Sequence, residues 1–108
     1  MIKVMAVGNV TKDLEVRSGT TKKEGEDKTY KVAKFTVASN RISEDKTDYV
    51  DVEVWNGQAE NCAKYLKKGS GVAVSGDLTF EEFTVNDEKR FKAVIKNAEI
   101  QFTDKKAG

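Results

Sequence analysis

Residues 48–55 alternate strictly between two kinds of side chain, and this alternation constrains the fold more than any other feature of the chain. The even positions from 50 to 54 hold valine, and the odd positions hold Tyr49, Asp51, Glu53 and Trp55. Successive side chains of a β-strand point to opposite faces. The segment therefore predicts a half-buried strand with three valines facing a core and two aromatic and two acidic residues facing outward.

Four further segments show the same period and predict strands over residues 2–17, 30–39, 72–85 and 91–102. The first is expected to be long and curved, with a bend at Gly8 and Asn9, and Gly76 is expected to bend the fourth strand of the chain. In the second strand the predicted core residues are Ala33, Phe35 and Val37. Residues 18–28 contain no apolar side chain and predict a solvated loop or hairpin tip.

One segment has the period of a helix. Spacings of i, i+3, i+4 and i+7 relate Ala59, Cys62, Ala63 and Leu66. This stripe predicts a helix over 58–68, with Asn56 as N-cap and Gly69 as the stop signal. The order of three strands, one helix and two strands in about 100 residues predicts an all-β fold, a five-stranded OB-fold barrel with one α-helix between strands 3 and 4.

Composition excludes several kinds of site. The chain has one cysteine and no histidine, so an internal disulfide, the usual zinc sites and histidine-based triads are excluded. Asp51 and Glu53 could ligate magnesium, but the common Asp…Glu-x-Lys arrangement of nucleases is absent. We therefore predict no enzyme activity, no catalytic residue, no metal and no cofactor.

Charge and hydropathy bear on partners and location. The net charge is +1, so any basic patch must be local. No apolar run approaches the roughly 20 residues that cross a bilayer, and we expect a cytoplasmic protein without a membrane partner.

The outward aromatics admit two interpretations. Tyr49 and Trp55 are six positions apart and share the face opposite the valines. They could stack on nucleic-acid bases, at about 1–3 kcal/mol per base, or contact another subunit. Phe83 lies near the end of a strand that is predicted to run to a turn at Asn86 and Asp87, and a turn at residues 87–88 would place Lys92 opposite Phe83. Lys89 and Arg90 at the hairpin tip could follow a phosphate backbone or keep the edge soluble.

Five stretches together resemble the bacterial and phage single-stranded-DNA-binding protein family. They are VGNV at 7–10, LEVR at 14–17, FTVASNR at 35–41, VWNGQAEN at 54–61 and KYLKKGS at 64–70. The resemblance covers residues 1–102 and implies a non-catalytic OB-fold domain over 1–103, with a short disordered end at 104–108. It also implies binding of single-stranded DNA without sequence preference, on a homodimer or homotetramer, in replication, recombination or repair.

The resemblance assigns the base-stacking role to three residues. The stacking aromatics of the family correspond to Tyr49, Trp55 and Phe83. Phosphate contacts are expected from Lys3, Arg17, Lys31, Lys34, Arg41, Lys89, Arg90 and Lys92.

The chain also departs from the family pattern. Ile42 stands near another family aromatic, and Asp51, Glu81 and Glu82 stand where basic residues are frequent. We therefore expect weaker or more salt-sensitive binding, or a DNA path shifted toward Lys3, Arg17, Lys31, Lys34 and Arg41.

Two further expectations concern partners. The acidic-hydrophobic tip by which the family recruits replication and repair enzymes does not follow Phe102, so tail-mediated partners are not expected. The alternative function is an OB-fold protein-interaction or oligomerisation module with weak or lost nucleic-acid binding, in which the outward aromatics contact a subunit or partner.

Overall fold

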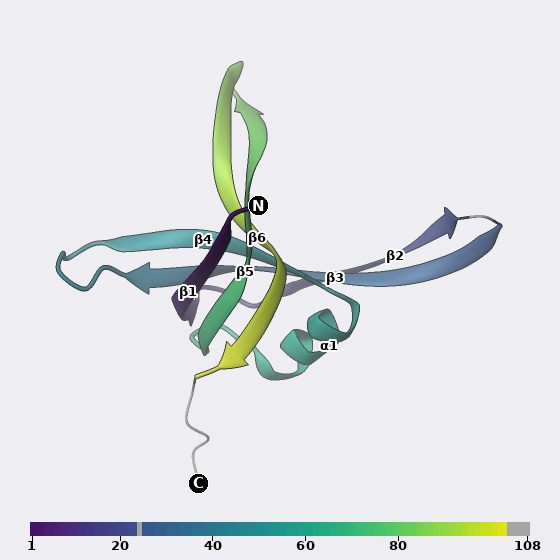
Figure 1. The fold of residues 1–108 in the computed structure, drawn as a ribbon, viewed down its shortest axis with the longest axis horizontal. Coiled ribbons are helices and arrows are strands. Elements are labelled where there is room, and N and C mark those ends of the chain that lie inside the picture. The colour runs from purple at the N-terminus through teal and green to yellow at the C-terminus, as the bar shows by residue number, and fades with distance from the viewer. Residues whose placement is uncertain (24, 104–108) are drawn as a thin grey trace, which may run out of the picture.

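The computed structural model describes residues 1–23 and 25–103. The short disordered end predicted at 104–108 therefore lies outside the described residues. Within the described part, the chain forms six strands and one helix (Figure 1). In chain order these are β1 (Lys3–Val10), β2 (Glu15–Lys23), β3 (Glu26–Asn40), β4 (Thr47–Trp55), α1 (Asn56–Tyr65), β5 (Gly71–Val85) and β6 (Glu88–Phe102).

Five of the strands close into a ring. Antiparallel ladders join β1 to β5, β5 to β6 and β3 to β4. A short parallel pairing, with Asp51 opposite Val94, joins β4 to β6, and Val10 opposite Val37 joins β1 to β3. β2 extends the sheet beyond the ring as the neighbour of β3. The predicted all-β, five-stranded OB barrel is confirmed, with α1 following the third strand of the ring.

The predicted first strand, residues 2–17, is in fact two strands. At Asn9 the chain pairs with Gly71 of β5 and with Ala38 of β3, so β1 passes from one neighbour to the other and closes the ring. A Cβ at Gly8 would overlap the carbonyl of Ala38, which explains why this position is glycine. The chain then leaves the ladder before β2 begins at Glu15.

The polar segment 18–28 is largely a hairpin, one of its two predicted forms. β2 and β3 remain paired from Glu15 opposite Lys34 to Lys23 opposite Glu26. The backbone ladder continues beyond the core because it does not need apolar side chains.

The helix is shorter than predicted and begins differently. It ends at Tyr65 rather than at residue 68, and Leu66 leaves the helical path and is buried in the core. Trp55 occupies the N-cap position, so the predicted cap Asn56 is wrong. Asn56 has a φ of 51°, and its side-chain oxygen instead accepts a hydrogen bond from the N–H of Lys31 at 3.2 Å.

The core is made largely by the predicted inward residues, but Ala63, which was predicted on the buried stripe of the helix, is exposed. The side chains of Ala33, Phe35 and Val37 are buried, and α1 adds Ala59 and Cys62 against one end of the barrel. Of the three predicted valines of β4, positions 52 and 54 are buried, and Val50 is partly buried against the same cluster. Gly76 lies at a register irregularity between β5 and β6, and the bend predicted there coincides with it.

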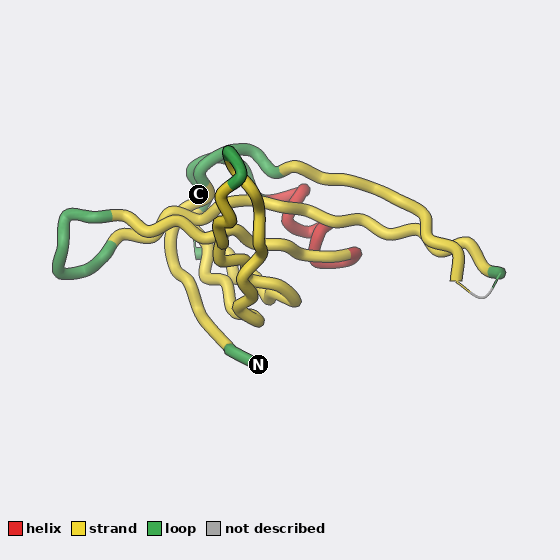
Figure 2. Tube along the Cα trace, turned by 90° about the horizontal axis from the view of Figure 1, so that it is seen from above, coloured by secondary structure: helices red, strands yellow, loops and turns green. Residues whose placement is uncertain are grey.

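Three hairpin arms extend from the barrel (Figures 1 and 2). They are formed by β2 with β3, by β3 with β4, and by β5 with β6, and the molecule measures 53 × 48 × 27 Å. The β5–β6 arm turns at Asn86 and Asp87, whose φ values of 51° and 63° are typical of a two-residue hairpin turn. Within the described residues, no helix is long and apolar enough to cross a membrane.

Candidate nucleic-acid interface

Two exposed aromatic rings lie on the outward face of β4. Tyr49 is 67% exposed and Trp55 is 44% exposed, and the register places them opposite Ala38 and Val32 of β3. The two residues lie on the same face of β4, as the alternation of the strand predicted. Arg17 of β2 lies opposite Val32 in turn, so a guanidinium-bearing side chain and the indole share this face across three strands.

Tyr30 is a residue of this face that sequence reasoning did not select. Its ring centroid lies 5.5 Å from that of Trp55, with the ring planes inclined by 47°. The Tyr30 ring extends over Gly19, where a Cβ would overlap it. The period of β3 places Tyr30 outward, but only the pairing of Val32 with Trp55 brings the two rings together.

The Trp55 indole is also bound through its edge. Its Nε1–H donates a hydrogen bond of 2.9 Å to Oε1 of Glu53, two residues earlier on the same face. Glu53 is only 8% exposed, and Lys34 Nζ lies 3.9 Å from its other carboxylate oxygen.

The third predicted aromatic, Phe83, is 39% exposed on the β5–β6 arm. The predicted partner Lys92 is wrong, because the turn lies at residues 86–87 rather than 87–88 and this moves the register by two residues. Arg90 is opposite Phe83, and Lys92 is opposite Glu81. An aromatic ring therefore still lies beside a cation, but the cation is a guanidinium.

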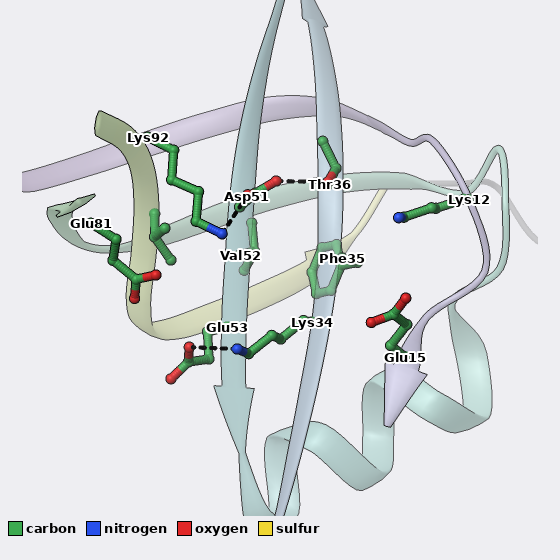
Figure 3. A pocket seen from close by; sticks show the side chains of 11 residues that line it. Lys12, Glu15, Lys34, Phe35, Thr36, Asp51, Val52, Glu53, Glu81 and Lys92 are labelled. Atoms are coloured by element: carbon green, nitrogen blue, oxygen red, sulfur yellow. Dashed lines mark hydrogen bonds and ion pairs between the residues drawn. The ribbon is translucent and has the colours of Figure 1, made fainter. Parts of the chain in front are cut away.

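A charged pocket of about 200 Å³ is lined by residues of β3, β4, β5 and β6, among them Asp51 and Glu53 from the outward face of β4 (Figure 3). Lys92 Nζ lies 3.8 Å from Asp51 Oδ2, and Thr36 Oγ1 donates a 2.7 Å hydrogen bond to Asp51 Oδ1. Glu81 forms a 2.9 Å ion pair with Lys96. This bond lowers the pKa of Glu81 and raises that of Lys96.

The lining of the pocket thus combines four carboxylates, those of Glu15, Asp51, Glu53 and Glu81, with the three ammonium groups of Lys12, Lys34 and Lys92. Lys96 is a cation that sequence reasoning missed, because its ion pair joins it to Glu81, which is not its partner in the β5–β6 register. The acids Asp51 and Glu53 hold lysines, and among the described residues no cluster of three or more potential metal ligands is found.

The eight predicted phosphate-contacting residues are dispersed. Near the pocket or the aromatics lie Lys34, Lys92, Arg90 and Arg17. The structure does not bring the remaining four to this face. Lys31 points to the side of β3 that faces α1 and pairs with Glu60 at 3.2 Å, and Lys3 pairs with Asp77 on β5. Arg41 lies in the β3–β4 arm, and Lys89 lies on the opposite face of the β5–β6 arm from Phe83.

Seven of these eight cations already lie within 3.9 Å of a carboxylate. Arg41 is the most strongly held, because Asp48 and Glu44 both accept hydrogen bonds from its guanidinium. The same contact lowers the pKa of Asp48. A phosphate that approached these residues would have to replace an internal carboxylate. Ile42, the position of a family aromatic, is fully exposed in the β3–β4 arm.

Comparison with known proteins gives consistent results. The model of the single-strand binding protein family matches residues 1–103. A single-stranded DNA-binding protein of Bacillus cereus is 35% identical over 117 residues, covering 100% of this chain and 63% of that protein. Single-stranded DNA-binding protein 1 of Clostridium acetobutylicum is 31% identical over 112 residues, covering 98% of this chain and 96% of that protein. The chain thus spans less than two thirds of the Bacillus relative but almost all of the Clostridium one.

Proposed function

Because this chain belongs to the single-strand binding protein family, we propose that it binds single-stranded DNA without sequence preference. The observation that carries the proposal is the exposure of the rings of Tyr49, Trp55 and Phe83, the first two of which share the outward face of β4 with Asp51 and Glu53 of the charged pocket. Every base has a flat π-face, so stacking on such rings is worth about 1–3 kcal/mol per base whatever the sequence. The names of the relatives in Bacillus and Clostridium support the same function.

In this proposal, the phosphates of the DNA add to the affinity by replacing carboxylates that pair with lysines in the free protein. Lys34 and Lys92 line the pocket, Lys96 pairs with Glu81 of its lining, and all three lysines are paired with a carboxylate in the free protein. The pairs of Lys92 with Asp51 and of Lys96 with Glu81 are more than one third exposed, and such pairs contribute only about 0–1 kcal/mol, so a phosphate can replace the carboxylate there at little cost. The acids reduce the net attraction, and they explain why we expect weaker binding than in a relative with basic residues at these positions.

Titration of the single tryptophan tests the proposal. Fluorescence of Trp55 is followed while oligo-dT or duplex DNA of equal length is added at two salt concentrations. Quenching by the single strand alone, weaker at the higher salt, is the expected result, because stacking needs unpaired bases and phosphate contacts are screened. If neither quenching nor binding occurs, the proposal fails and the protein-interaction module becomes the better interpretation.

A matched variant separates the proposed face from other exposed aromatics. Tyr65 is exposed at the end of α1 and makes an edge contact with Phe102, with centroids 5.7 Å apart, away from the pocket. Tyr65→Ala should therefore bind oligo-dT like the unmodified protein, whereas Phe83→Ala should bind it more weakly. Equal effects of both substitutions would place the DNA elsewhere.

The proposal includes self-association as a dimer or tetramer. Met5 and Val7 of β1 are exposed, with Ser75 and Ala73 of β5 beside them in register, and this apolar strip would be covered in an oligomer. Light scattering coupled to size exclusion measures the mass directly.

Action in replication, recombination or repair, in the cytoplasm of a bacterial cell or of a phage-infected host, belongs to the same proposal.

A further inference from the structure

Glu53 is a charged residue in an unusual place. It lies on the outward face of β4, between Asp51 and Trp55, and yet it is almost completely buried. Removing a carboxylate from water is unfavourable unless the carboxylate gains hydrogen bonds or charged partners. The neighbours of Glu53 should therefore show what this residue does.

The closest polar partner of Glu53 is the Trp55 indole. The 2.9 Å hydrogen bond from Nε1–H to Oε1 is charge-assisted, because the acceptor is a carboxylate. Lys34 lies opposite Glu53 in the β3–β4 ladder, and its ammonium group is 3.9 Å from Oε2. The carboxylate thus lies between an indole edge on its own strand and a cation on the neighbouring strand.

The geometry of the bond leaves the indole able to stack. An indole N–H lies in the plane of the ring, so a partner at Nε1 occupies the edge and covers neither π-face. Tyr30 contacts the ring at an inclination of 47°, and Val32, opposite Trp55 in register, is buried on this outward face. Three neighbours from two strands therefore restrict the orientation of the ring while 44% of the residue stays exposed.

We propose that Glu53 is a positioning residue, whose carboxylate holds the Trp55 indole in the orientation in which a DNA base stacks on it. This inference rests on the proposed function. A ring that is ordered before binding loses less conformational freedom when a base arrives. The saving expected for one side chain corresponds to roughly two- to tenfold in affinity.

Two substitutions separate the hydrogen bond from the charge. Glu53→Gln removes the charge but keeps an oxygen that can accept from Nε1–H, and Glu53→Val removes both in a side chain that suits a strand. The difference between the two variants therefore isolates the hydrogen bond. Glu81→Gln is the matched control, because it removes a carboxylate from the same pocket without touching Trp55.

The first readout needs no DNA. Time-resolved fluorescence anisotropy of Trp55 in the free protein should show a larger fast component in Glu53→Val than in Glu53→Gln or Glu81→Gln. The second readout is affinity for labelled oligo-dT, which should be two- to tenfold weaker for Glu53→Val than for Glu53→Gln. In a Trp55→Phe background, which lacks the N–H, the two Glu53 variants should bind equally.

Equal ring mobility and equal affinity of the two Glu53 variants would overturn the inference. If circular dichroism shows that Glu53→Val does not fold, Glu53→Thr replaces it, since the threonine hydroxyl is too short to reach Nε1. Failure of the unmodified protein to bind oligo-dT would overturn the proposed function and the stacking role together. The anisotropy would then still report whether Glu53 holds the ring, so the two failures are distinguishable.

Discussion

Asp51 offers a direct test of the charged pocket, because an amide can replace it with little structural change. Its Oδ1 accepts the 2.7 Å hydrogen bond from Thr36, and the side-chain oxygen of asparagine can accept the same bond. The other carboxylate oxygen faces Lys92 at 3.8 Å. Asp51→Asn therefore removes one negative charge and releases one lysine while the strand pairing of β3 and β4 stays intact.

The expected gain follows from the geometry of this pair. Two unit charges about 4 Å apart interact by about 1 kcal/mol in water, and both side chains are more than one third exposed. Measured values for exposed pairs are about 0.2–1 kcal/mol. If Lys92 then contacts a phosphate, affinity for single-stranded DNA should rise by up to about fivefold at low salt.

This gain in affinity should decrease as the salt concentration rises. One additional contact with a single strand changes the slope of log affinity against log salt by about −0.7. A fivefold gain at about 50 mM salt should therefore fall to about twofold at about 200 mM. Fluorescence anisotropy of labelled oligo-dT over this range measures both the affinity and the slope.

The control is Glu99→Gln, which removes the same charge elsewhere on β6. Glu99 pairs in register with Ser75, five residues along the strand from Val94, roughly 16 Å from the pocket if the strand is extended. It should change the affinity less than Asp51→Asn does. Equal effects of the two variants would mean that only net charge matters. Unchanged or weaker binding by Asp51→Asn would refute a phosphate path past Lys92.

Three further outcomes are expected. Tyr49→Ala should weaken oligo-dT binding by about 1–3 kcal/mol, and light scattering should show an unchanged mass; a changed mass with unchanged affinity would make Tyr49 an interface residue. Gly8→Ala should lower the free energy of unfolding in urea by at least about 1–3 kcal/mol, because the new Cβ would overlap the Ala38 carbonyl; an unchanged midpoint would contradict this close approach. Burial raises the pKa of the Cys62 thiol from 9.0 to about 11, so the unfolded thiol loses its proton first as pH rises. Stability should therefore be fully present below about pH 9 and decline toward about pH 11, and the decline should be smaller in Cys62→Ala, as urea unfolding across this pH range would show.

Much of the architecture could be predicted from local pattern. The alternation of β4 correctly separated core valines from outward aromatics, and the helical spacing was right for Ala59 and Cys62 but wrong for Ala63, which is exposed. These predictions succeed because side-chain direction along one element depends only on its period. The same argument placed Tyr49 and Trp55 on one face before any pairing of strands was known.

The sequence pattern predicted the ends of the helix less reliably than its existence. Leu66 has the spacing of a helical core residue, but it reaches the core from the segment after α1. Asn56 has the chemistry of an N-cap, but its side chain binds the backbone of β3. In both cases a tertiary contact is more favourable than the local preference of the residue.

The sequence by itself determined which residues face the core, where the single described helix lies and which aromatic side chains face outward. Only the tertiary structure decided their partners. The β5–β6 pairing placed Arg90 beside Phe83 and brought Lys96 to Glu81, and the β3–β4 register brought Tyr30 to Trp55. The physical reason is that register is set by backbone hydrogen bonds and turn geometry between segments distant in sequence, and a shift of two residues preserves every face but changes every neighbour.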